Sequence, residues 1–224
     1  MIKAVLFDCD GLMFETERIS VMLWRQEAKR YGIDLPDDFF VHIIGAGKEE
    51  CQAYMASEPG LCALRDHVAG KRFDLQFWGG CAKDTLNKRG LVELYAYLHD
   101  HGYLIGICSS SSQAYVLTLL STVSEKLSYD VLVTGDMVTH AKPDPEIFLA
   151  GAQRLHVHPE ECLVLEDSKV GIMAAHAAGM HSCWIKDMID EDEEMTSCIE
   201  YRCYDLFGVM QLLEELNGGN NEIQ

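Results

Sequence analysis

The chain has 224 residues, a formal net charge of −18, and 48% hydrophobic residues. This composition excludes a disordered chain and provides enough apolar side chains for one large domain, or for one domain with an insertion. The negative charge argues against nucleic acid as a partner, because binding to its phosphates requires clustered lysine and arginine.

The cysteines and the apolar runs indicate an expected compartment. Nine cysteines are scattered without a C-x-x-C pair, which is typical of reduced thiols rather than of a disulfide framework. No stretch approaches the roughly 18 apolar residues of a membrane span, and the first residues enter a predicted strand without a signal peptide. We therefore expect a cytoplasmic protein with no membrane or nucleic-acid partner, either a monomer or a weak homo-oligomer.

The first predicted element is a strand at residues 2–8. A helix at 17–31 follows it and ends at Gly32. Residues 37–83 contain further helical stretches and no β-rich run. From residue 91 onward, strands and helices alternate. The strands are predicted at 104–108, 130–134, 162–166 and 182–185, and the helices at 91–101, 112–122, 145–155, 169–178 and 205–216. This alternation predicts an α/β fold with a doubly wound, Rossmann-like parallel sheet, and residues 187–194 are expected to form an acidic, solvated loop.

Polar patches follow the predicted strands and offer the candidate chemistry. They are Asp8-Cys9-Asp10-Gly11, Ser109-Ser110-Ser111, Lys142-Pro143 and Glu166-Asp167. In an open α/β sheet, ligands bind beyond the carboxyl ends of the strands. Carboxylates, hydroxyls and one ammonium would therefore meet in one crevice. Such a set of groups predicts Mg²⁺-assisted phosphoryl transfer with a carboxylate as the nucleophile.

These motifs, in this order, resemble those of the haloacid dehalogenase (HAD) superfamily, and most closely its β-phosphoglucomutase-like phosphatases. The resemblance is carried by VLFDCDGL at 5–12, KPDPEIF at 142–148 and LEDS at 165–168. It covers roughly residues 1–187, and residues 15–83 match only loosely. It implies an α/β core at 1–14 and 84–224 and an inserted helical cap at 15–83, which closes over the site and contacts the leaving group.

The resemblance implies distinct roles for the two aspartates. Asp8 would attack phosphorus and form an aspartyl-phosphate. Asp10 would protonate the leaving alkoxide and then deprotonate the attacking water. The dehalogenase and phosphonatase branches lack an aspartate at the place of Asp10, so this residue indicates phosphoryl transfer.

The remaining motif residues would bind phosphate and metal. The hydroxyl of Ser109 and the N–H of Ser110 would hold a phosphoryl oxygen, whereas Ser112 is interpreted as a helix start. Lys142 would neutralise Asp8 and the phosphoryl oxygens. The expected cofactor is Mg²⁺, whose preferred ligands are oxygens. Its candidate ligands are Asp8, the carbonyl of Asp10, Asp167, and Glu166 either directly or through water.

The leading hypothesis is a Mg²⁺-dependent phosphatase acting on a small phosphorylated metabolite, with a sugar phosphate as one candidate. A phosphosugar mutase is the alternative. The related mutases carry a histidine in the first cap helix, and the matching segment 18–21 here reads RISV, which favours hydrolysis. A non-catalytic binding protein on the same fold is the third hypothesis. Residues 45–49 and 77–83 are the expected cap contacts, and Lys48 either contacts the substrate or is solvated.

Overall fold

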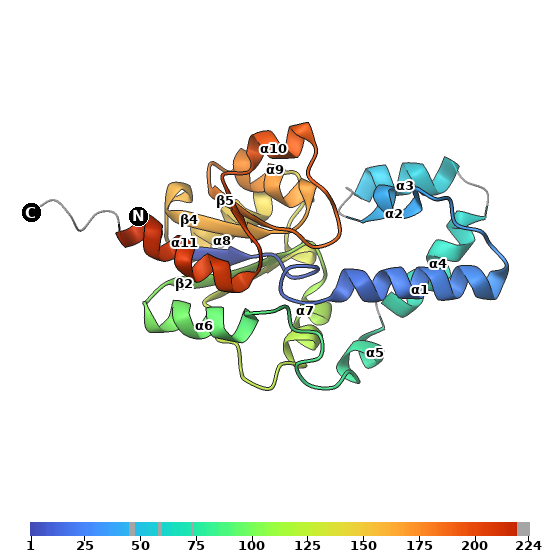
Figure 1. Cartoon of the computed structure of the whole chain (residues 1–224), viewed down its shortest axis with the longest axis horizontal. Coiled ribbons are helices and arrows are strands. Elements are labelled where there is room, and N and C mark those ends of the chain that lie inside the picture. Colours follow the sequence, from blue (N-terminus) through green and yellow to red (C-terminus); the bar gives the residue numbers. More distant parts are fainter. Residues whose placement is uncertain (45–47, 58–59, 73, 219–224) are drawn as a thin grey trace, which may run out of the picture.

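A parallel sheet organises the chain (Figure 1). The computed structural model describes residues 1–44, 48–57, 60–72 and 74–218. Within them, six parallel strands form one sheet in the order β3-β2-β1-β4-β5-β6. The strands are β1 (Ala4–Phe7), β2 (Leu104–Ser109), β3 (Val131–Thr134), β4 (Cys162–Glu166), β5 (His181–Ile185) and β6 (Tyr201–Cys203). The predicted doubly wound α/β fold is therefore confirmed.

The sheet is covered on both faces because side chains alternate along each strand. Val5 and Phe7 of β1 belong to one buried cluster, and Ala4 and Leu6 belong to another. The first cluster includes residues of α6 (Leu91–Asp100), α7 (Gln113–Leu120) and α11 (Leu206–Gly218). The second includes residues of α8 (Glu146–Leu155) and α9 (Lys169–Ala177). Apolar packing on both faces explains why β1 is a continuous apolar run.

A helical cluster lies to one side of the sheet (Figure 1). It contains α1 (Thr16–Tyr31), α2 (Phe39–Ile43), α3 (Lys48–Ser57) and α4 (Leu61–Arg72). Trp24 packs edge-on against Phe39 at 4.9 Å between ring centroids, and both side chains belong to a separate apolar core. Gly32 ends α1 in the left-handed conformation, as its position predicts.

The join between the helical cluster and the sheet runs through α5 (Leu75–Gly79). Trp78 of α5 is fully buried in the sheet's own core and meets Tyr115 of α7 edge-on at 5.8 Å between ring centroids. The domain limits 1–14, 15–83 and 84–224 stay a prediction. The packing of α5 shows that the end of the predicted insertion is anchored on the core.

The sequence analysis did not predict two elements near the C-terminus. The strand β6 has three residues at the sheet edge, and none of them is fully buried, so it leaves no apolar run in the sequence. Helix α10 (Glu193–Cys198) begins inside the segment expected to be an acidic loop. The Asp192 carboxylate accepts the Met195 N–H at 2.8 Å and caps it, and Met195 is the one buried residue of this helix.

The expectations about membrane spans and cysteines can be compared directly with the structure. No helix among the described residues is long and apolar enough to cross a bilayer. The nine cysteines are free thiols, as their spacing predicts.

The centre of the sheet offers a test of the packing. Leu6 is fully buried above Gly106 of β2 and Gly151 of α8, where added β-carbons would lie 2.5 Å and 3.6 Å from its side chain. Leu6→Ala leaves a cavity there, so we expect it to lower the free energy of unfolding by about 2–5 kcal/mol. Leu117→Ala, at a position 43% exposed on α7, is the matched control and should change stability by less than about 1 kcal/mol. Equal effects in urea denaturation would contradict this packing.

Candidate active site

The predicted motifs meet at the carboxyl edge of the sheet. Asp8 directly follows β1, and its N–H donates to the carbonyl of Leu165 in β4 at 3.1 Å, so strand pairing fixes its backbone. Ser109 ends the neighbouring strand β2, and Glu166 ends β4. The residue types predicted from the strand ends are therefore placed side by side.

Lys142 is the centre of the site. Its Nζ donates to Asp8 Oδ1 at 2.5 Å, to Glu166 Oε1 at 2.7 Å and to the Cys108 carbonyl at 3.1 Å. It also lies 4.7 Å from the centroid of the Phe148 ring. Only 3% of the side chain is exposed. Burial alone would lower the pKa of this ammonium, but the two carboxylates outweigh burial and raise the pKa above its ordinary value.

Glu166 uses both carboxylate oxygens inside the protein. Oε1 accepts from Lys142, whereas Oε2 accepts from the N–H groups of Asp167 and Ser168 and from the Ser168 hydroxyl, at 2.9–3.0 Å. The side chain is fully buried. A β-carbon on Gly171 would lie 1.7 Å from Oε1, so glycine at the start of α9 makes room for this carboxylate. Direct metal coordination by Glu166 would have to compete with these bonds.

Asp8 and Asp167 have the properties of cation ligands. Oxygens of Asp8, Glu166 and Asp167 lie within 4.8 Å of one another, all on buried residues. Asp167 Oδ1 is buried and has no hydrogen-bond partner among the described residues. Burial, and then the charges of Glu166 and Asp8, raise the pKa of Asp167 well above its ordinary value. An orphaned carboxylate oxygen among acidic neighbours fits a hard cation such as Mg²⁺.

The same electrostatics act on Asp8. Burial raises the pKa of Asp8 to about 7; Lys142 opposes this shift and Glu166 adds to it. The approach of Asp167 to this loop also depends on Gly11, whose φ is +76°. A β-carbon there would lie 2.2 Å from Asp167 Oδ2. Gly11 therefore allows the turn that follows Asp8 and Asp10, and it lets Asp167 approach this turn closely.

Asp10 points toward α7. Its Oδ2 accepts from the Ser111 hydroxyl at 2.7 Å, and its Oδ1 accepts from the Tyr115 hydroxyl at 3.1 Å. Sequence reasoning missed Ser111 and Tyr115 as partners of this aspartate. The tyrosine could have been noticed as a polar tip on the buried face of a helix that begins at the serine run, because buried Tyr hydroxyls find partners.

The serines at 109–112 have different structural roles. Ser109 is buried, and its hydroxyl oxygen accepts the N–H of Ser111 at 3.1 Å. Ser110 is exposed, with its backbone at the sheet edge. Ser112 caps α7 by accepting the N–H of Tyr115 at 3.4 Å, as predicted. The phosphate-binding roles of Ser109 and Ser110 stay predictions that their placement permits.

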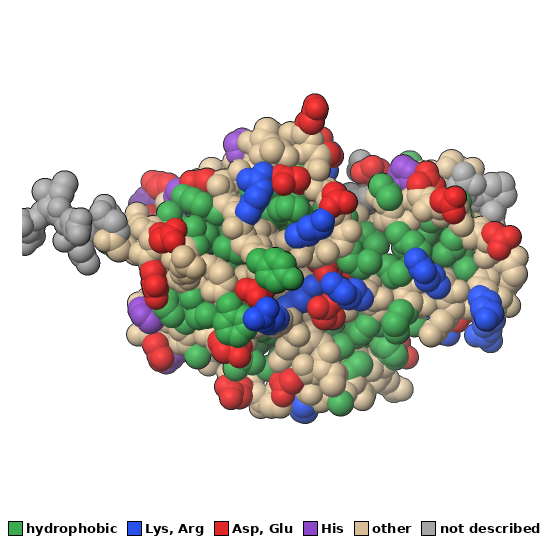
Figure 2. All heavy atoms as spheres, viewed as in Figure 1, with side chains coloured by type: hydrophobic (Ala, Val, Ile, Leu, Met, Phe, Trp, Pro, Cys, Tyr) green, Lys and Arg blue, Asp and Glu red, His purple; other side chains and the backbone are tan. Residues whose placement is uncertain are grey.

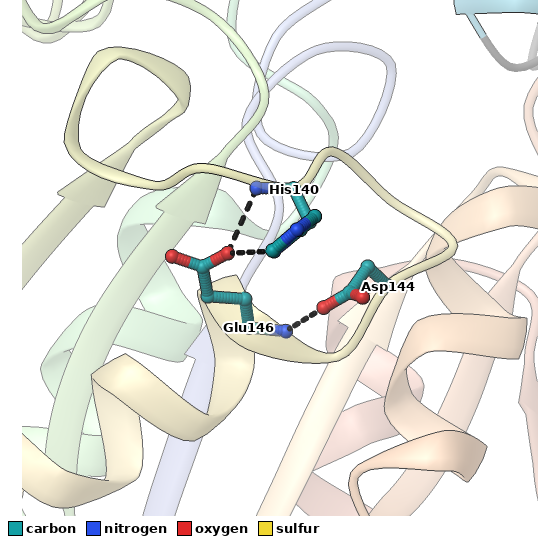
Figure 3. Close-up of side chains that lie close together, drawn as sticks. All are labelled: His140, Asp144 and Glu146. Atoms are coloured by element: carbon teal, nitrogen blue, oxygen red, sulfur yellow. Dashed lines mark hydrogen bonds and ion pairs between the residues drawn. The ribbon is translucent and has the colours of Figure 1, made fainter.

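The loop that carries Lys142 is closed by a second polar cluster (Figure 3). The Glu146 carboxylate accepts the N–H groups of Thr139 and His140 and contacts the His140 ring, at 2.8–2.9 Å. Asp144 accepts the N–H of Glu146 at 2.9 Å. This cluster is partly exposed, and its carboxylate oxygens accept backbone N–H groups of the loop. We therefore infer that it stabilises the conformation of the loop.

The expected cap contacts are placed only in part. Residues 45–47, and the side chains of Lys48 and Glu49, lie outside the described residues. In the segment 77–83, Trp78 packs into the core, as described above. Lys83 Nζ donates to the carbonyl of Ser121 on the core. This segment thus serves largely to join the helical cluster to the sheet.

Comparison with known proteins agrees with this geometry. Residues 5–185 match the family described as haloacid dehalogenase-like hydrolase. The phosphorylated carbohydrates phosphatase of Thermotoga maritima is 29% identical over 180 residues, which cover 80% of this chain and 82% of the relative. The validoxylamine A 7′-phosphate phosphatase of Streptomyces hygroscopicus subsp. limoneus is 30% identical over 193 residues, covering 80% and 84%.

A solved structure shares the whole architecture. The β-phosphoglucomutase from Clostridium difficile aligns with a TM-score of 0.74 over 98% of this chain and 99% of its own, at 22% identity, which is evidence for the fold. The family match covers most of the chain and includes Asp8, Ser109, Lys142 and Glu166. The chain therefore belongs to the haloacid dehalogenase-like hydrolase family.

Proposed function

We propose that this protein is a Mg²⁺-dependent phosphatase that hydrolyses a small phosphorylated metabolite, with sugar phosphates as the first candidates. The observation that carries the proposal is the buried Asp8 carboxylate, held by Lys142 and adjoining the orphaned oxygen of Asp167. The relatives named above support the substrate class, since one of them is a phosphatase of phosphorylated carbohydrates.

In the first step, a carboxylate oxygen of Asp8 attacks phosphorus while the bond from phosphorus to the leaving oxygen breaks. Lys142 orients Asp8 and offsets the negative charge that the phosphate brings into a buried site. Asp10 gives its proton to the leaving alkoxide. To reach the leaving oxygen, Asp10 exchanges one of its hydrogen bonds to Ser111 or Tyr115.

In the second step, water attacks the phosphorus of the aspartyl-phosphate and Asp10 accepts its proton. The bond between phosphorus and Asp8 breaks, which releases inorganic phosphate and restores both aspartates. Asp8, Asp167 and the Asp10 carbonyl would hold Mg²⁺. The ion would supply positive charge to the transferring phosphoryl group. Glu166 would act mainly by positioning Lys142 and the loop that carries Asp167.

Hydrolysis is favoured over the mutase alternative. A mutase must protect its phosphoenzyme from water until the sugar accepts the phosphoryl group again. Ser20 of α1 is buried and lies in the segment where the related mutases carry a histidine. No other described residue supplies a specific argument for mutase chemistry, so water is the proposed acceptor.

A panel of phosphorylated sugars tests the activity. With Mg²⁺, at least one member should release inorganic phosphate, and EDTA should abolish release until Mg²⁺ is added back. Asp8→Asn, which removes the nucleophile, should lower kcat by at least about 10³-fold. Full activity in metal-free buffer would contradict the Mg²⁺ assignment. Conversion of β-glucose 1-phosphate into glucose 6-phosphate without phosphate release would make the protein a mutase.

The division of labour between the aspartates gives a second test. Asp10→Asn should lower kcat for a sugar phosphate by about 10²–10⁴-fold, because both steps lose their proton carrier. With p-nitrophenyl phosphate, whose leaving group needs little protonation, the first step partly survives. Mass spectrometry should then detect an adduct of about 80 Da on Asp8, as covalent catalysis requires. An adduct on the Asp8→Asn protein would show that another residue is the nucleophile.

The positioning role of Glu166 can be separated from folding. Gly171→Ala places a β-carbon against the Glu166 carboxylate and displaces it from Lys142. We expect kcat to fall by at least about 10²-fold, since small misplacements of catalytic groups cost that much. Gly70→Ala is the matched control, because nothing lies within 4 Å of a β-carbon there. Circular dichroism should show both variants folded. Wild-type kcat in Gly171→Ala would disprove the role of Glu166.

A further inference from the structure

A cavity of about 640 Å³ lies where the helical cluster joins the core. Its walls come from the segment after β1 and the start of α1 (Leu12, Glu15, Arg18), from the segment before α6 (Lys88, Arg89), and from the ends of β5 and β6 with the residues that follow them. None of Asp8, Asp10, Ser109, Lys142, Glu166 and Asp167 lines it. Its volume is in the range of small-molecule sites, roughly 300–1,000 Å³. This hinge cavity is therefore a separate candidate site.

The hinge cavity concentrates positive charge in an acidic protein. Five lining residues are cationic, namely Arg18, Lys88, Arg89, Lys186 and Arg202, and three are acidic, namely Glu15, Asp187 and Asp205. This excess of two positive charges contrasts with the net charge of −18 for the chain. Figure 2 shows Lys and Arg side chains gathered between the part that carries the sheet and the helical part.

The cations at the rim of the cavity are held in ion pairs, and an anionic ligand can take the place of their carboxylate partners. Arg89 pairs with Asp205 at 3.2 Å, and Arg202 pairs with Glu191 at 2.5 Å. The two guanidinium side chains are 72% and 43% exposed. The contact of Arg89 with Asp205 is of a kind that contributes little to stability, whereas Arg202 donates to both oxygens of Glu191. Lys186 pairs with Asp190. Guanidinium groups bind phosphate through two parallel hydrogen bonds, so an incoming phosphate can take the place of these carboxylates.

Two further lining residues, Asp187 and Tyr204, differ strongly in exposure. The Asp187 side chain is only 2% exposed; its Oδ1 pairs with Lys88 at 2.6 Å, and its Oδ2 has no hydrogen-bond partner in the described part of the chain. That oxygen is buried, so Asp187 acts from inside the wall of the cavity by holding Lys88. Tyr204, which also lines the cavity, is 89% exposed. An exposed aromatic ring can stack on a planar ring.

We propose that the hinge cavity binds a nucleotide-like ligand, that is, a phosphate ester with a planar ring. The phosphate contacts Arg89 and Arg202, and the ring lies on Tyr204. The cavity wall also includes Arg18 of α1, so a ligand in the cavity lies against the helical cluster as well as the core. Occupancy therefore changes the free energy of moving the helical cluster relative to the core.

One hydrogen bond connects the wall of the hinge cavity with the catalytic edge. Trp184 lines the cavity, and its Nε1 donates to the carbonyl of Asp167 at 3.1 Å. We expect the bound ligand to alter kcat without competing with substrate. Binding itself is independent of the proposed phosphatase activity, whereas the effect on kcat rests on it.

Calorimetry with α,β-methylene-ADP tests binding, because its P–C–P bridge resists hydrolysis. Arg89→Gln/Arg202→Gln should weaken binding at least about tenfold by removing charge-assisted hydrogen bonds. Arg25→Gln/Arg65→Gln, on the surface of the helical cluster, is the matched control and should bind like the wild type. Methylenediphosphonate, which lacks the ring and the hydroxyls, should bind at least about tenfold more weakly. Equal affinity in both double variants, or for both probes, would overturn the proposal.

Steady-state rates with p-nitrophenyl phosphate locate the effect. In the wild type, α,β-methylene-ADP should change kcat, and this change should disappear in Arg89→Gln/Arg202→Gln. A purely competitive effect that persists in this variant would place the ligand at the catalytic edge and overturn the proposal. If the protein hydrolyses no phosphate ester, the proposed function fails, and calorimetry still decides whether the hinge cavity binds the ligand.

Discussion

The site depends on one buried ammonium. Lys142 contacts Asp8, Glu166 and the carbonyl of Cys108, and thereby connects the ends of β1, β4 and β2. Three buried carboxylates without this cation would repel one another and protonate. With it, two carboxylates are paired and the third, Asp167, retains an unpaired oxygen. The remaining negative charge is the reason why this edge is proposed to bind a further cation.

Burial explains how so acidic a chain could bind anions. A net charge of −18 repels phosphate esters at long range. At the catalytic edge, attraction arises from groups shielded from water, where each charge acts more strongly. The hinge cavity differs, because four of its five cations are exposed to solvent. The two sites would consequently respond differently to salt, and the exposed one would weaken more.

Much of this arrangement could be predicted from the sequence because the relevant signals are local. A carboxylate directly after an apolar strand, as for Asp8, must lie at the sheet edge once the strands are parallel. The partners of Asp10 are different, because Ser111 and Tyr115 meet it only through the packing of α7 on the core. Strand β6 was missed because an edge strand of three residues carries no periodic signal. What the sequence leaves open is thus long-range contact and elements too short to bury a face.

The central place of β1 affects how the protein is made. Its two neighbours, β2 and β4, begin at Leu104 and Cys162, so the first strand leaves the ribosome long before either partner exists. Helices α1–α4 follow it immediately and contain their own apolar cluster, which can assemble from nearby residues. Chains dominated by such distant pairings fold slowly. During synthesis, the apolar strand that ends in the candidate nucleophile therefore remains unpaired longest, and this stage is the one at which chaperones would protect the chain from aggregation.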